Sequence, residues 1–188
     1  LGKHNSFLID GETILHNKNC IDKIKEIYKN HEVAVHTLTH PNLTTLKDKE
    51  IIKQVEEDRQ NLTQLVDYEV VGMAYPCGEI NNNDHVAEII KNNTGVKYSR
   101  TIKSSYSFDL QDNLYRFNPT VYHLEIDKMF TLGEEFINLK TDKPQIYYIW
   151  GHSYELDIGD RWKKFEEFCK LISNRNDIYY GTNTQILI

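Results

Sequence analysis

The stretch Glu32-Val33-Ala34-Val35-His36-Thr37-Leu38-Thr39-His40-Pro41 joins a short apolar run to two histidines that stand four residues apart. The run over 32–35 predicts a β-strand. His36 then follows directly at the carboxyl end of that strand, and Pro41 stops the turn after the second histidine. Because polar side chains follow this predicted strand directly, the ends of the other predicted strands are also candidate positions for functional residues.

Helices and strands alternate on both sides of this stretch. Apolar periodicity predicts helices over 21–28, 45–66, 83–90, 126–139 and 161–172, and strands over 70–75, 96–99, 114–117, 145–150, 178–180 and 185–188. Short apolar runs around Asp10-Gly11 predict a hairpin over 7–15, and the polar residues 103–113 predict a loop. Thr45 with Asp48 predicts a capping box at the start of the long helix, and Gly95 predicts a helix stop.

Strands that alternate with helices along a whole chain indicate βα units with parallel strands. No Gly-x-Gly-x-x-Gly sequence and no Walker loop follows any predicted strand, so a nucleotide-binding fold lacks its site. We therefore expect an α/β fold arranged like a (β/α) barrel, in a single domain over residues 1–188. In such barrels the functional side chains lie at the carboxyl ends of the strands.

Composition excludes several classes of protein. The 188 residues carry 22 Lys plus Arg against 28 Asp plus Glu, a net charge of −6 that argues against a dedicated nucleic-acid binder. No apolar run approaches the roughly 20 residues of a membrane span. The sequence opens on Leu1 rather than Met, which indicates a processed, trimmed or cloned fragment.

The cysteines indicate free thiols. Cys20, Cys77 and Cys169 are odd in number and far apart, which fits neither a disulfide framework nor a Cys-x-x-Cys zinc site. Free thiols suit a reducing compartment, so we favour the cytoplasm, while a segment upstream of Leu1 leaves the compartment open.

The two histidines of the opening stretch predict a metal site. Imidazoles at positions i and i+4 lie on one side of a helical turn, about one metal ion apart. The alternative is that one histidine caps the turn and the other is a surface residue. His36-Thr37-Leu38-Thr39-His40 has no Glu in its second position, which disfavours a metalloprotease of the His-Glu-x-x-His kind.

Two further strand ends carry candidate groups. Tyr75-Pro76-Cys77-Gly78 predicts a tight turn whose backbone N–H groups suit an oxyanion hole; the alternative is an ordinary strand-ending turn. Cys77 has no histidine near it in sequence, which argues against a nucleophile.

In Trp150-Gly151-His152-Ser153-Tyr154-Glu155, His152 is a candidate general acid or base that Glu155 and Asp157 are close enough to orient. The alternative is a hydrogen-bonded structural histidine. The remaining histidines are expected to be ordinary, namely His4, His16, His31, His85 and His123.

These segments together resemble a known family. His36-Thr37-Leu38-Thr39-His40 resembles the His-(Ser/Thr)-x-x-His metal motif of the polysaccharide deacetylases, carbohydrate esterase family four. Ala74-Tyr75-Pro76-Cys77-Gly78 resembles their Arg-x-Pro-(Tyr/Phe)-Gly segment, and His152 is similar to their late catalytic histidine. The resemblance implies a distorted (β/α) barrel that hydrolyses N-acetyl groups of an amino-sugar polymer or peptidoglycan-type glycan.

The resemblance also implies residue roles. His36 and His40 would bind a divalent metal, most commonly zinc, which polarises the acetyl carbonyl and activates a water. The backbone N–H of Cys77 would share the oxyanion with the metal, and His152 would protonate the leaving amine.

Two departures from the family pattern qualify this reading. The family's Asp-Asp-Gly motif, which supplies a base and the third metal ligand, has no counterpart, since Asp10-Gly11 is too near His36 and lies in the predicted hairpin. Ala74 replaces the motif's Arg, for which Arg116 or Arg100 would substitute. We therefore expect a truncated form of a polysaccharide-deacetylase-like metal hydrolase that lacks its first strand. Its two neutral metal ligands and the unidentified base leave the site open, which can make this truncated form inactive.

The alternative function is a glycan-binding pseudoenzyme on the same scaffold. Its pocket would stack sugar rings on the tyrosines, 12 in the chain, and on Trp150. In both cases the partner is an N-acetylated glycan or a related small carbohydrate; the polymer and the oligomeric state do not follow from the sequence.

Overall fold

A computed structural model describes residues 18–188, and contacts divide the chain into two compact units. Unit 1 comprises Leu1–Thr101, Asn113–Phe117 and Gly181–Ile188, and unit 2 comprises Ile102–Asp112 and Asn118–Tyr180. The hairpin predicted over 7–15 lies outside the described residues. None of the helices within 18–188 is long and apolar enough to cross a membrane. The single domain over 1–188 stays a prediction.

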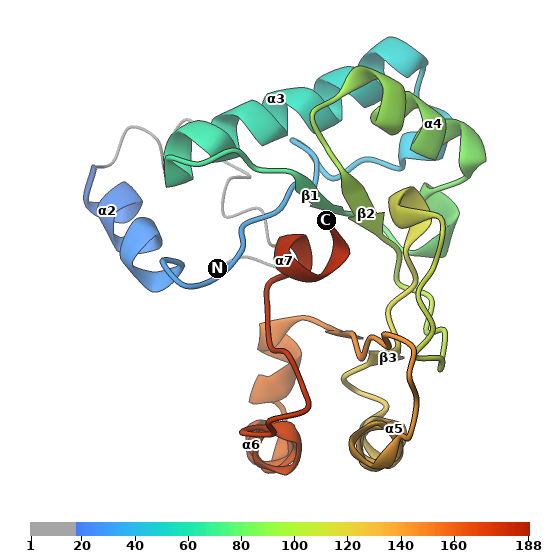
Figure 1. Ribbon diagram of the computed structural model, residues 1–188. Coiled ribbons are helices and arrows are strands. Elements are labelled where there is room, and N and C mark those ends of the chain that lie inside the picture. The colour runs from blue at the N-terminus through green and yellow to red at the C-terminus, as the bar shows by residue number, and fades with distance from the viewer. Residues whose placement is uncertain (1–17) are drawn as a thin grey trace. The chain divides into compact units, whose positions relative to one another are not determined.

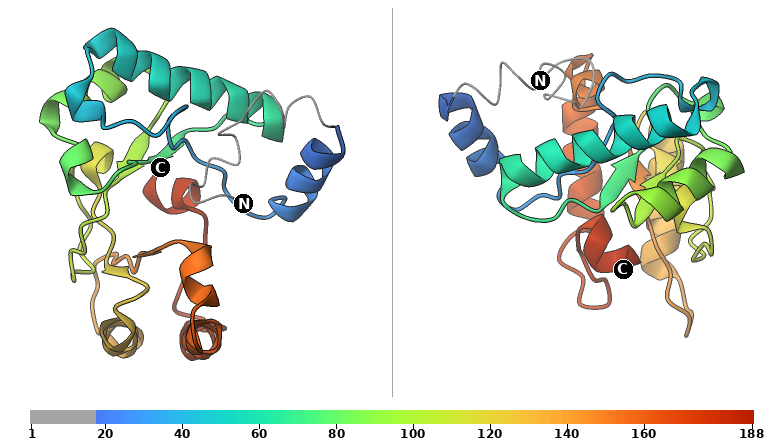
Figure 2. Two further views of the ribbon diagram at one scale, coloured as in Figure 1. Left: turned by 180° about the vertical axis from the view of Figure 1, so that it is seen from behind. Right: turned by 90° about the horizontal axis from the view of Figure 1, so that it is seen from above.

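Unit 1 is built on short parallel strands covered by helices. Strands β1 (Gly72–Ala74) and β2 (Tyr98–Arg100) pair in parallel, and single parallel bridges add Val35 to β1 and Phe117 to β2. Helices α3 (Asp48–Val66) and α4 (Asp84–Asn93) contact each other and lie on the same side of these strands (Figures 1 and 2). The other elements of the unit are α2 (Lys18–Ile27), α7 (Asn183–Leu187) and the 3-10 turns η1 (Leu43–Thr45), η2 (Glu79–Asn81) and η3 (Leu114–Arg116).

The core of unit 1 explains why α3 is a helix. Its residues Ile51, Val55, Leu62 and Leu65 repeat at helical spacing and are buried against the strands. Fully burying an aliphatic side chain of this size stabilises the fold by roughly 1.5–3 kcal/mol. This stripe turns one face of α3 toward the sheet. The polar residue Asp58 lies on the same buried face.

Glu32 connects the last helix to the rest of unit 1. Its carboxylate accepts hydrogen bonds from the Thr184 N–H at 2.8 Å, the Thr184 hydroxyl at 2.7 Å and the Tyr98 hydroxyl. The Thr182 N–H in turn donates to the Gln185 side chain at 2.9 Å, half of a capping box that starts α7. This Thr-x-x-Gln sequence makes the segment helical, so the strand predicted over 185–188 is wrong.

Unit 2 repeats the parallel pairing on a smaller scale. Strand β3 (Val121–Tyr122) pairs with β4 (Ile149–Trp150), and helices α5 (Ile126–Asn138) and α6 (Arg161–Ile172) lie side by side (Figure 1). The helices approach closely at Gly133, where an added Cβ would lie 2.7 Å from the Phe168 ring. The 3-10 turn η4 (Ser153–Asp157) connects β4 toward α6.

The α/β class and the parallel strands are confirmed, while the closed barrel and its missing first strand stay predictions. Helix α6 has the predicted bounds, and α4 begins as predicted, because the Asn83 side chain accepts the Val86 N–H at 2.9 Å. The strands are shorter than predicted, with only Ile149–Trp150 paired in the run 145–150.

Three further local predictions are wrong. The strand over 114–117 is mostly the 3-10 turn η3, because the Asn113 side chain accepts the Tyr115 N–H at 3.1 Å. The cap of α3 is Lys47, whose N–H donates to the Glu50 carboxylate at 3.2 Å, instead of a Thr45–Asp48 box. Residues 178–180 form no strand.

Gly95 does not end α4 in a left-handed conformation. The helix ends at Asn93 with Thr94 as its C-cap, directly before Gly95 as predicted, and the Gly95 N–H donates to the Glu56 carboxylate at 3.0 Å. An added Cβ at Gly95 would lie 2.4 Å from the Arg59 guanidinium, so a larger residue here would displace the end of that side chain.

Candidate functional site

The structure brings His36 and His40 together in unit 1. Their ring centroids lie 5.0 Å apart with the planes at 67°. The segment between them is not helical, since Thr37 (φ 70) and His40 (φ 57) have left-handed backbone conformations. The predicted helical turn is therefore wrong, and the two imidazoles meet across a non-helical segment that contains these two left-handed residues.

A hydrogen bond sets the orientation of the His36 ring. Its Nδ1 lies 2.7 Å from the carbonyl oxygen of Ala74, the last residue of β1. Because a carbonyl only accepts hydrogen bonds, Nδ1 carries the proton, and the lone pair of the neutral ring is on Nε2. Metal-binding histidines are commonly oriented in this way, through the ring nitrogen that does not hold the metal.

Asp58 holds the backbone of this turn, although no sequence motif singled it out. The side chain is 2% exposed, and its carboxylate accepts hydrogen bonds from the His36 N–H, at 2.9 Å, and from the Thr37 N–H. Burial raises the pKa of this carboxyl to about 6, even though both hydrogen bonds act to lower it. A left-handed β-branched residue such as Thr37 costs on the order of 1–3 kcal/mol, which Asp58 helps to offset. The available signal was a carboxylate within the buried stripe of α3.

The turn after β1 contacts His40. Cys77 (φ 62) places its Sγ 3.1 Å from His40 Nδ1 and 3.1 Å from the His40 carbonyl oxygen. Within residues 18–188 the Cys77 N–H donates to no acceptor, and its oxyanion role stays a prediction. Burial raises the pKa of the Cys77 thiol, which opposes a thiolate nucleophile, as the sequence analysis concluded.

The donor set of this turn fits part of a metal site. Two imidazoles with Nε2 lone pairs suit zinc or a similar divalent ion. The described part of the chain contains no group of three His, Cys, Asp or Glu side chains that could hold an ion. His36 and His40 would thus supply two protein ligands and leave further positions to other groups.

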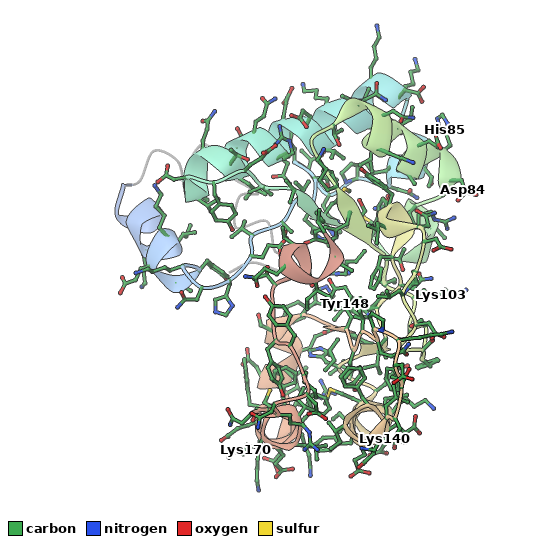
Figure 3. The ribbon with its side chains drawn as sticks, in the orientation of Figure 1. Asp84, His85, Lys103, Lys140, Tyr148 and Lys170 are labelled. Atoms are coloured by element: carbon green, nitrogen blue, oxygen red, sulfur yellow. The ribbon has the colours of Figure 1, made fainter. Side chains whose placement is uncertain are left out.

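Arg116 and Arg100 also belong to unit 1. Arg116 donates from Nη1 to the Asp84 carboxylate at 2.7 Å and from Nε to Asn82 at 3.0 Å. Asp84 stands beside His85 at the start of α4 (Figure 3). Arg100 is buried and its Nη1 lies 3.3 Å from the Thr101 carbonyl oxygen. That either arginine substitutes for the family's motif arginine stays a prediction.

In unit 2 the Glu155 carboxylate joins two histidines. It accepts hydrogen bonds from the His152 N–H at 3.0 Å, from His123 Nε2 at 2.8 Å and from the Tyr122 hydroxyl. His152 Nδ1 lies 3.1 Å from Glu155 Oε2, but off the line of a directed hydrogen bond. Asp157, expected beside His152, instead accepts a hydrogen bond from the Trp162 indole at 2.7 Å.

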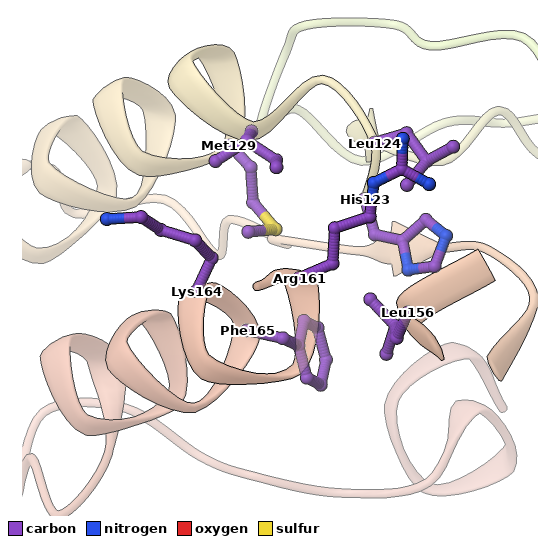
Figure 4. Close-up of a pocket in the computed structure, with 8 residues that line it drawn as sticks. His123, Leu124, Met129, Leu156, Arg161, Lys164 and Phe165 are labelled. Atoms are coloured by element: carbon purple, nitrogen blue, oxygen red, sulfur yellow. The ribbon is translucent and has the colours of Figure 1, made fainter. Parts of the chain in front are cut away.

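His123 is therefore not an ordinary histidine, and that expectation is wrong. It is 5% exposed and lies beside Leu156, Arg161 and Phe165, which line the same pocket (Figure 4). An added Cβ at Gly151 would lie 2.2 Å from its ring, so glycine is needed next to His152 to admit this imidazole.

The pKa of Glu155 is low. Burial alone would raise it, but the hydrogen bonds from Tyr122, His123 and His152 outweigh burial and hold the pKa at about 2. A folded-state pKa below the unfolded value of 4.5 stabilises the fold above pH 4.5, and this stability is lost as the pH falls toward 2. The difference corresponds to roughly 3 kcal/mol at neutral pH.

We expect Glu155→Gln to reduce the acid sensitivity of unit 2. Between pH 5 and pH 2 the native protein should lose roughly 3 kcal/mol more unfolding free energy than the variant. Urea titrations followed by tryptophan fluorescence measure this, because Trp150 and Trp162 both belong to unit 2. Glu134→Gln on the exposed face of α5 is the control and should keep the native pH dependence. Parallel curves for native protein and Glu155→Gln would contradict the prediction.

Comparison with known proteins gives consistent likenesses. The family model described as "Polysaccharide deacetylase" matches residues 3–98, just over half of the chain. The probable 4-deoxy-4-formamido-L-arabinose-phosphoundecaprenol deformylase ArnD of Wigglesworthia glossinidia brevipalpis is 26% identical in an alignment 174 residues long that covers 84% of this chain. The alignment spans 59% of that relative's length.

Two solved structures are similar over about half of this chain. The deacetylase PplD of Streptococcus pyogenes, in complex with acetate, is 19% identical with a TM-score of 0.45, over 52% of this chain and 42% of its own. A polysaccharide deacetylase from Bacillus cereus is 21% identical with a TM-score of 0.44, over 52% of this chain and 30% of its own.

Proposed function

This chain belongs to the polysaccharide deacetylase family, and from that premise we propose that it is a metal-dependent hydrolase that removes an N-acyl group from an amino sugar. The observation that carries the proposal is the pairing of His36 and His40, whose ring centroids lie 5.0 Å apart directly after Val35, the residue that bridges to β1. The bond broken is a carbon–nitrogen bond of an amide that is not a peptide.

Each candidate residue has a distinct role in the proposal. His36 and His40 would hold a divalent ion, which when bound supplies Lewis acidity toward the amide carbonyl and lowers the pKa of a water. The Cys77 N–H would donate to the oxygen that becomes negative as the amide is attacked. His152, with Glu155 against its ring, would give a proton to the leaving amine nitrogen.

Two acyl groups, acetyl and formyl, are candidates for the group that is removed. The family description favours an acetylated glycan, whereas the printed name of the Wigglesworthia relative describes a deformylase that acts on a formamido sugar. Acetamide and formamide differ by one methyl group, which a binding pocket discriminates by roughly 10- to 200-fold.

The test is to incubate purified full-length protein, loaded with zinc, with N-acetylated chito-oligosaccharide and, separately, with an N-formylated amino sugar. We expect release of acetate or formate with one free amine formed for each acid. A glycan that binds in calorimetry while neither acid is released would instead support the glycan-binding pseudoenzyme. Ester cleavage without amide cleavage would contradict the proposed reaction.

A further inference from the structure

We propose that Cys77 is a positioning residue that holds the imidazole of His40 with its lone pair on Nε2. This inference rests on the proposed metal-binding role of His40. The observation behind it is the pair of contacts that one sulfur atom makes with one histidine, 3.1 Å to the ring Nδ1 and 3.1 Å to the backbone oxygen.

The directions of these two hydrogen bonds follow from the atoms. The His40 carbonyl oxygen only accepts, so the Cys77 S–H donates to it. Since the thiol has one proton, its sulfur is then the acceptor toward Nδ1, and Nδ1 must carry the ring proton. In the neutral ring the lone pair is therefore on Nε2.

The result matches the arrangement at His36. There the Ala74 carbonyl oxygen receives the Nδ1–H at 2.7 Å, and the lone pair is again on Nε2. Both imidazoles would thus offer the same nitrogen to one ion. A backbone carbonyl sets the tautomer at His36, whereas a side chain sets it at His40, which makes His40 the one that substitution can change.

The backbone supports this role for Cys77. Cys77 (φ 62) and His40 (φ 57) are both left-handed without being glycine, a conformation that costs of order 1 kcal/mol or more and persists where surrounding contacts enforce it. The two sulfur contacts join these two turns, which stand 37 residues apart in sequence. These contacts therefore fix the orientation of the His40 ring relative to the turn that carries Cys77.

The test compares native protein with Cys77→Ala, Cys77→Ser and Cys169→Ala. In metal-free protein, ¹⁵N NMR of the imidazole nitrogens should show His40 protonated on Nδ1, and Cys77→Ala should shift it toward the Nε2-protonated form. The tautomer of His36 should be unchanged in every variant, which would show that the turn is still folded. Cys77→Ser should restore the native tautomer, because a hydroxyl donates and accepts in the same way.

Zinc calorimetry is the second readout. We expect Cys77→Ala to weaken zinc binding by about 10- to 100-fold, as loss of a group that orients a ligand does, and Cys169→Ala on α6 to leave it unchanged. A native tautomer in Cys77→Ala together with native zinc affinity would overturn this inference and leave the proposed function intact. Absence of zinc binding by the native protein would overturn the proposed function itself, whatever the tautomer of His40.

Discussion

Replacing His36 with alanine should abolish stoichiometric zinc uptake. The variant loses one of two imidazoles, and the Ala74 carbonyl loses its Nδ1–H donor, while Asp58 keeps its hydrogen bond from the backbone N–H at position 36. Because changes to groups that merely orient a ligand weaken metal binding about 10- to 100-fold, loss of the ligand itself should exceed that range. Native mass spectrometry and calorimetry both measure the loss, and His40→Ala should behave in the same way.

The matched control is His85→Ala. His85 also belongs to unit 1, but its side chain is 63% exposed and pairs with Asp48 at 2.8 Å, and it lies on helix α4, far from either proposed ligand in sequence. The His85→Ala variant should bind zinc as the native protein does. This result would distinguish a specific site from a general affinity of histidines for zinc. Undiminished zinc binding by His36→Ala would end the metal-site proposal.

The helices could be predicted because each has a complete local signal. Helix α6 shows an apolar stripe over its whole length, and α4 has in addition an Asn83 cap, so both were found from sequence. The strands have only two or three paired residues each, and their pairing is set by residues far along the chain. An apolar run such as 145–150 therefore shows where a strand lies without showing that only Ile149 and Trp150 pair.

The site could be predicted only in part, for the same reason. The spacing of His36 and His40 identified the pair, although left-handed residues bring the rings together instead of a helical turn. The contacts from Asp58 to His36, from Cys77 to His40 and from His123 to Glu155 join residues 22, 37 and 32 positions apart. No local pattern encodes such contacts, so these supporting residues appear only once the chain is folded.

Replacing His152 with alanine should lower kcat for amide hydrolysis by about 10²- to 10⁴-fold, the usual contribution of a general acid or base. The reason is that the amine leaves only when its nitrogen is protonated, and alanine has no proton to give. KM and zinc affinity should stay close to native, since neither depends on that proton transfer. The rate of acetate or formate release measures the change.

Glu155→Gln distinguishes catalysis by His152 from a structural role. The glutamine amide oxygen can still accept the His152 N–H and the His123 hydrogen bond, but it carries no charge beside the His152 ring. If the Glu155 carboxylate acts through His152, we expect Glu155→Gln to lower kcat less than His152→Ala does. Its pH–rate profile should be displaced while KM stays unchanged. If His152 only supports the fold, both variants should lose thermal stability, while the protein that remains folded turns over at the native rate. Release of acetate or formate by His152→Ala at the native kcat would refute the catalytic role of His152.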